Sequence, residues 1–104
     1  MAQHIGLELV DEDGELIIDS RINVASVMDA LLEIESCKER YPWLTTIDEY
    51  GDTIFNRLQI PLVIRELTVL SSEKPELGQV ISGILHFLEQ SFQDVHQFVK
   101  FVGD

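Results

Sequence analysis

Alternating apolar and polar residues open the chain and predict a β-hairpin. Alternation runs through Ile5, Leu7 and Leu9, stops at the run "DEDG", and resumes at Leu16 and Ile18. A period of two that turn residues interrupt is typical of two antiparallel strands. We therefore expect a hairpin over residues 5–19.

A helical period replaces this alternation after Asn23, a residue type that often caps helix N-termini. Apolar residues then recur at Val24, Val27, Met28, Leu31 and Leu32. This spacing predicts an amphipathic helix of about four turns. Pro42 should end the helix, because a proline disfavours the helical conformation of the residue before it, here Tyr41.

The stretch "DEYGDTIFNRLQIPLVIREL", residues 48–67, predicts a turn at Gly51 followed by a central helix. Asp52 is well suited to cap that helix, and the apolar positions that follow face nearly every direction. Pro61 should kink or restart the helix. We expect Arg65 and Glu66 to pair at its edge or to point outward.

The last third of the chain predicts a long helix. Pro75 suits a first helical position, and residues 76–102 hold a steady helical period. One helix of this length would extend about 40 Å, longer than a domain of this size is wide, so we expect a break near Ser91 or a projecting end. The core should pack two helical stripes together: Phe55, Leu58 and Leu62 against Leu85, Leu88 and Phe92.

The predicted fold class is α+β, with a small N-terminal β-hairpin packed against a body of three to four helices. The 104 residues, of which 45% are apolar, suit a single acidic globular domain spanning 1–104. The first residues lack the basic start and apolar run of a secretory signal, and no apolar stretch approaches about 18 residues. We therefore expect a cytoplasmic protein that does not enter a membrane.

Charge carries the clearest functional signal. Nineteen acidic and seven basic residues give a net charge of −12, and residues 1–52 alone carry thirteen of the acidic and three of the basic residues. Such a field repels nucleic acid and anionic lipid and attracts basic proteins. We expect a basic protein partner, with no nucleic acid and no membrane. An acidic surface that serves only solubility is the alternative that remains open.

No pattern in the chain indicates catalysis or a cofactor. The sequence lacks a glycine-rich phosphate loop, a cysteine pair and a histidine pair four residues apart. His86 and His96 would lie about 15 Å apart along one helix, too far to share a metal. The hairpin turn lacks the first and last ligands of a calcium loop. Cys37 is expected to act as a small apolar residue, and the chain is expected not to be an enzyme.

Two clusters of carboxylates are candidates for binding a partner. The first is Asp48, Glu49 and Asp52 around Tyr50, with Tyr41 and Trp43 nearby in sequence; the second is Asp11, Glu12, Asp13 and Glu15 in the hairpin turn. We prefer the first, because charge around an aromatic anchor is typical of binding hot spots and a flexible turn loses more entropy on binding. Tyr41 and Trp43 are either lids on the core, which we favour, or exposed anchors.

In overall size, charge and lack of catalytic motifs, the chain resembles the immunity proteins that bacteria pair with secreted toxins, including those of contact-dependent growth inhibition systems. The resemblance implies that the chain binds and occludes the cationic active site of a cognate toxin, such as a nuclease. It assigns no role to any residue. The alternative is a small acidic adaptor or self-associating domain whose partners bind Tyr41, Trp43 or the C-terminal helix. In solution we expect a monomer or weak dimer.

Overall fold

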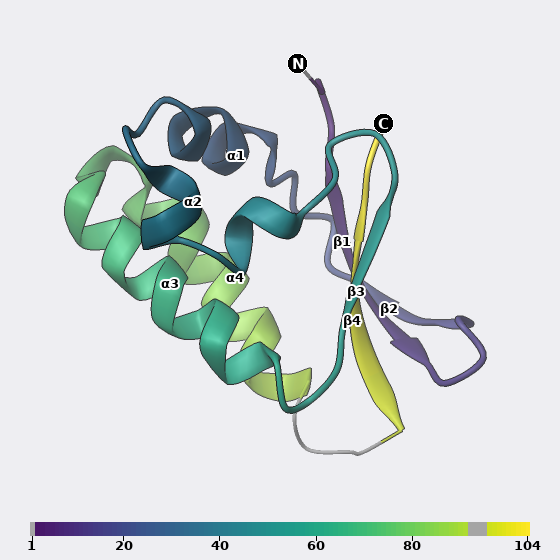
Figure 1. Ribbon diagram of the computed structural model, residues 1–104. Helices are drawn as coiled ribbons and strands as arrows, with labels where there is room; N and C mark the ends of the chain where they lie inside the picture. The colour runs from purple at the N-terminus through teal and green to yellow at the C-terminus, as the bar shows by residue number, and fades with distance from the viewer. Residues whose placement is uncertain (1, 92–95) are drawn as a thin grey trace.

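A four-stranded antiparallel sheet carries a layer of helices on one face (Figure 1). The computed structural model describes residues 2–91 and 96–104. The strands are β1 (Gly6–Asp11), β2 (Leu16–Asp19), β3 (Asp52–Phe55) and β4 (Gln97–Val102), in the order β2-β1-β4-β3. The helices are α1 (Ala25–Leu32), α2 (Cys37–Arg40), α3 (Ile60–Glu73) and α4 (Gly78–Ser91), with 3-10 turns η1 (Leu44–Thr46) and η2 (Pro75–Leu77). The predicted α+β class and the helical body are confirmed.

The predicted N-terminal hairpin is present as β1 and β2. Ile5, Leu7 and Leu9 are buried against the helices, as the alternation predicts. β2 lies at the edge of the sheet, and all four of its residues are exposed. A register irregularity between Leu9 and Val10 interrupts the pairing of the two strands.

The helix predicted for residues 76–102 is wrong in its last part, although the break expected near Ser91 is confirmed. α4 ends at Ser91, and residues 97–102 form the strand β4 between β1 and β3. The sequence "QFVKFV" also satisfies a period of two, with Val99 and Phe101 buried and Lys100 between them. Pairing on both sides satisfies its backbone groups, which a projecting helix end would leave to water. The predicted stripe residues Phe92 and Val95 lie outside the described residues.

Asp52 does not cap a helix, because it begins strand β3, which pairs with β4. Phe55 at the end of β3 packs edge to face against Phe101 with ring centroids 5.8 Å apart. The cap function passes to Asn56, whose side-chain oxygen accepts the backbone amides of Leu58 and Gln59 at 2.9 and 3.0 Å. α3 then begins with Pro61 in its first turn, so the proline starts the helix rather than kinking it.

The helix expected after Asn23 is shorter than predicted. α1 ends at Leu32, and Ser36 adopts a left-handed conformation with φ of 61° before the single turn of α2. α2 ends at Arg40, where Pro42 was expected to stop a helix. Asn23 does act at the start of α1, because its side-chain oxygen accepts the amide of Ala25 at 3.0 Å. The same oxygen accepts the amide of Ile5, which ties the hairpin to the helix.

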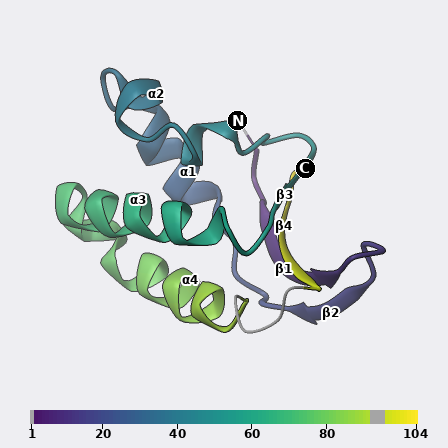
Figure 2. The same cartoon turned by 60° about the horizontal axis from the view of Figure 1, so that its bottom comes forward.

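The core fills the space between the sheet and the helices, while the other face of the sheet carries no helix (Figure 2). α3 contributes Ile60, Val63, Leu67 and Leu70, and α4 contributes Ile81, Ile84 and Leu88. The predicted core stripe was wrong at Leu58, which is 71% exposed, and at Leu62, which lines a surface cleft. The reason is that α3 begins only at Ile60, so other residues of the helix face the core. Among the described residues, no helix combines the length and apolar character needed to cross a membrane.

Stability should therefore depend on Leu70 and not on Leu58. Leu70→Ala is expected to lower the free energy of unfolding by about 2–5 kcal/mol, because it empties a fully buried position. Leu58→Ala should stay within about 0.5 kcal/mol of the wild type, because its side chain already meets solvent. Urea unfolding of both variants measures the difference. Equal losses of unfolding free energy in the two variants would contradict the finding that Leu70 faces the core and Leu58 faces solvent.

Candidate protein-binding surface

The helix-free face of the sheet, called here the outer face, presents an apolar cleft. The strand register sets Val10 opposite both Phe98 and Leu16, and residues that lie opposite each other share a face of a sheet. Val10, Phe98 and Ile54 line a shallow cleft of about 140 Å³ together with Asp11, Glu12 and Gly14. Ile54 is 52% exposed and Phe98 is half-buried, whereas Val10 is only 1% exposed, so the apolar surface that the described chain leaves open in this cleft comes from Ile54 and Phe98.

Carboxylates of the hairpin turn border this cleft, and the turn that carries them is ordered. One Asp11 side-chain oxygen accepts the backbone amides of Asp13 and Glu15, each at 2.9 Å. The Asp11 carbonyl accepts the amide of Gly14, whose positive φ of 82° suits a glycine. Glu12, Asp13 and Glu15 are exposed. These hydrogen bonds give the turn a defined conformation, which weakens the entropy argument against this cluster.

The second carboxylate cluster, at residues 48–52, lies at the opposite end of the sheet. Val102 pairs with both Gly6 and Asp52 at one end, whereas Asp11 pairs with Gln97 at the other. The five residue steps of β1 from Gly6 to Asp11 correspond to about 17 Å. The two clusters therefore cannot contribute to one small site, and each must be considered separately.

The loop that carries the second cluster is held by the C-terminus of the chain. Gly103 donates its amide to the Gly51 carbonyl at 2.8 Å, and Asp104 donates to the Glu49 carbonyl at 2.9 Å. A Cβ atom on Gly103 would lie 2.4 Å from the Gly51 nitrogen, so only glycine permits this approach. Asp48 accepts the Tyr50 amide within the loop. The carboxylate of Asp52 lies 3.4 Å from the Lys100 ammonium, which offsets part of its charge.

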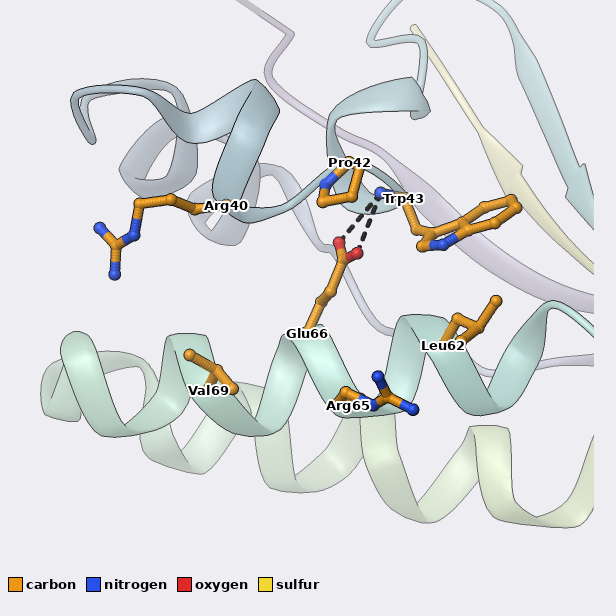
Figure 3. A pocket seen from close by; sticks show the side chains of 7 residues that line it. All are labelled: Arg40, Pro42, Trp43, Leu62, Arg65, Glu66 and Val69. Carbon is orange, nitrogen blue, oxygen red and sulfur yellow. Dashed lines mark hydrogen bonds between the residues drawn. The ribbon is translucent and has the colours of Figure 1, made fainter.

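The predicted aromatic anchor around this loop is not assembled. Tyr41 is fully buried and belongs to the core, as the lid interpretation predicts. Trp43 is half-buried and lines a different cleft beside α3 (Figure 3). Only Tyr50 is exposed, at 61%. The first cluster therefore lacks the arrangement that made it the preferred candidate.

The cleft beside α3 is built on a buried carboxylate that the sequence did not reveal. Glu66 is 8% exposed, and its oxygens accept the backbone amides of Trp43 and Leu44 at 2.9–3.1 Å. The alternative in which Arg65 pairs with Glu66 at the helix edge is wrong, because the Glu66 side chain points toward residues 42–43 (Figure 3). Arg65 is exposed, as the outward alternative predicts, whereas Glu66 is buried. Its bonds hold the segment after α2 against α3 and leave a cleft of about 270 Å³ between them.

A second carboxylate, Glu73, links α3 to the end of α2. Arg40 donates both terminal nitrogens to Glu73 at 2.7 and 2.9 Å, and the Tyr41 hydroxyl donates to the same carboxylate. The bond from Arg40, with that from Tyr41, lowers the pKa of Glu73 below its usual value. Burial of Tyr41, together with this hydrogen bond, raises the pKa of its hydroxyl to about 12.

Within the part of the chain that the structure describes, no group of three or more His, Cys, Asp and Glu side chains is placed to hold a metal ion. His86 is exposed on α4, whereas His96 lies beyond that helix, so the expected placement of both on one helix was wrong. Nδ1 of His96 lies 3.1 Å from an Oε of Glu12, beside the hairpin turn.

Comparison with known protein families, with curated proteins and with solved structures gave no match.

The Glu73 network gives a pH-dependent contribution to stability. Because the folded pKa of Glu73 is lowered, its stabilisation is present above the usual carboxyl pKa near 4.5 and is lost as the pH falls through the lowered value. Glu73→Gln should therefore reduce the melting temperature at pH 7 and cause progressively less loss in acid. Glu76→Gln, which removes the same charge outside this network, is the control. A loss of melting temperature in Glu73→Gln that is the same at every pH would contradict a stabilising contribution from the ionised Glu73 carboxylate.

Proposed function

We propose that the chain is a non-catalytic binding protein that captures a basic protein with the outer face of its sheet. The observation that carries the proposal is the apolar cleft of Val10, Ile54 and Phe98 with Asp11 and Glu12 at its border. Exposed apolar patches rimmed by polar residues are typical of protein interaction sites. The acidic rim selects the sign of the partner's charge.

The two parts of this surface would act at different steps of binding. The net charge of −12 attracts a basic protein over a distance and raises the rate of encounter, an effect that salt screens. Ile54 and Phe98, which line the cleft, would then lose contact with water, which supplies affinity that salt does not remove. The ordered turn loses little further entropy when its carboxylates pair with the partner.

The biological activity that fits this surface best is inhibition of a toxin. A nuclease active site must hold phosphate and is therefore cationic, so an acidic surface placed over it excludes the substrate. This is the mode of action that the resemblance to bacterial immunity proteins implies. It requires no chemistry from the chain itself. In a cytoplasmic setting the protein would protect the cell that makes it.

Of the two carboxylate clusters, the hairpin turn is now the better candidate. Its residues adjoin the apolar cleft, whereas the loop at 48–52 lies at the far end of the sheet without a surrounding aromatic anchor. Binding energy concentrates where charge surrounds a desolvated apolar centre. This preference reverses the one drawn from the sequence.

An adaptor function is the second candidate, and one observation favours it. The cleft beside α3 belongs to the helical layer, and none of its lining residues borders the cleft on the outer face. Two separate clefts would allow two partners to bind at once.

Charge reversal at the hairpin tests the proposed function. The chain is immobilised at low ionic strength, a retained basic protein is purified, and its affinity is measured by calorimetry. Glu12→Lys with Glu15→Lys should weaken binding at least tenfold, about 1.4 kcal/mol, and reduce its salt dependence. Asp11 stays unchanged because its side chain holds the turn.

Asp48→Lys with Glu49→Lys is the matched control, since it makes the same charge change at the other end of the sheet. It should slow association slightly and leave dissociation unchanged. A larger loss in this control would return the site to residues 48–52. Failure to retain any basic protein, or unchanged affinity in both variants, would contradict capture by charge.

A further inference from the structure

The cleft beside α3 has the chemistry of a second, distinct interface. Its apolar lining consists of Pro42, Trp43, Leu62 and Val69. Leu62, Arg65 and Val69 are spaced three and four residues apart, so they share one face of α3 (Figure 3). Val69 is 50% exposed. This face of α3 therefore leaves apolar surface open beside the segment at 40–43.

Basic residues are frequent in the two segments that form this cleft, although the chain as a whole is acidic. Five of the seven basic residues fall within 38–40 and 57–74, namely Lys38, Arg40, Arg57, Arg65 and Lys74. The same two segments hold three acidic residues, and two of them, Glu66 and Glu73, already accept internal hydrogen bonds. Of the residues that line the cleft itself, Arg40 and Arg65 are basic and Glu66 is acidic.

Arg65 is the cation best placed to meet a partner. It lines the cleft and is exposed. Arg40 is already paired with Glu73, whereas among the residues that the structure describes no carboxylate pairs with Arg65. An exposed guanidinium beside apolar side chains favours an occupant that carries a carboxylate next to apolar groups.

The backbone of the cleft excludes an extended occupant. Glu66 accepts the amides of Trp43 and Leu44, and the carbonyls of Tyr41 and Trp43 accept from Thr45 and Thr46. A strand added here would find no free partners for its own amides and carbonyls. A helix satisfies those groups internally and presents only side chains, which is what this cleft can receive.

The volume of the cleft is also compatible with side chains from a helix. At about 270 Å³ it lies at the lower limit of the roughly 300–1,000 Å³ typical of small-molecule sites. It can take the apolar side chains from one face of a helix while the rest of that helix remains outside. We infer that the cleft between α3 and residues 40–43 binds an acidic amphipathic helix of a partner protein, with a carboxylate on Arg65 and apolar side chains against Trp43. This inference does not rest on the proposed function.

Tryptophan fluorescence tests this inference directly, because the chain holds a single tryptophan, Trp43. The probe is a synthetic helical peptide with leucines along one face and glutamates on both flanks. Its control has lysine in place of every glutamate. The acidic peptide should change the fluorescence saturably and bind at least tenfold more tightly than the lysine peptide. Absence of a saturable change, or equal binding of both peptides, would overturn the inference.

A charge swap locates the contact. Arg65→Glu should weaken the acidic peptide at least tenfold and favour the lysine peptide, because it reverses the sign of the recognition group. Arg21→Glu makes the same charge change at a residue that does not line the cleft, and it should leave the preference unchanged. Thermal unfolding confirms that both variants are folded. Equal effects of the two substitutions would show that only net charge matters and would refute a site at Arg65.

Binding of the acidic peptide in the cleft beside α3 can be tested separately from binding of a basic protein on the outer face. The double variant Glu12→Lys with Glu15→Lys should still bind the acidic peptide in the cleft beside α3. Its affinity should change only by the small amount that the altered net charge causes. Loss of peptide binding in that variant, with Arg65→Glu unaffected, would assign the peptide to the hairpin and overturn the second interface.

Discussion

The central position of the last strand is the constraint on which the rest of the structure depends. β4 pairs with β1 on one side and with β3 on the other, so the three strands form one sheet only when residues 97–102 lie between them. Val99 and Phe101 then face the helices, and Phe98 lies opposite Val10 on the outer face. The same strand therefore builds the core and the candidate binding surface. Its continuation through Gly103 and Asp104 holds the loop at 48–51.

The features that the sequence predicted correctly are those with strong local signals. Alternation around "DEDG" identifies the hairpin, and Pro42 identifies the end of a helix. β3 and β4 were missed because short apolar runs fit both helical and extended periods, and because a strand in the sheet is defined by partners far away in the chain. Val99 and Val102 fit a helical stripe until Phe98 and Lys100 are counted as the alternate face. Asp52 resembled a cap because nothing local shows that it pairs with Val102.

The sequence predicts which charged residues could bind a partner, but it does not predict how they are arranged on the surface. The sequence identified both carboxylate clusters, yet only the sheet register shows that they lie at opposite ends and that Asp11 and Glu12 adjoin Val10, Ile54 and Phe98. Tyr41 and Trp43 look equivalent in sequence, yet Tyr41 lies in the core and Trp43 lines the cleft beside α3. This difference depends on the hydrogen bonds of Glu66 and Glu73, which join α3 to the segment after α2. An alternating Glu8–Leu9–Val10 pattern could have suggested an outer apolar residue, but its partner Phe98 had been assigned to a helix.

The described part of the chain forms a cleft bordered by carboxylates on the sheet and another, lined by Arg65 and Trp43, beside the helices. The central claim is that the first captures a basic protein. Backbone amide resonances of the isotope-labelled chain, followed while the purified partner is added, test it most directly. We expect the largest shifts at Val10, Ile54, Phe98 and the hairpin turn. Shifts confined to α3 and Trp43, or to the loop at 48–51, would contradict it.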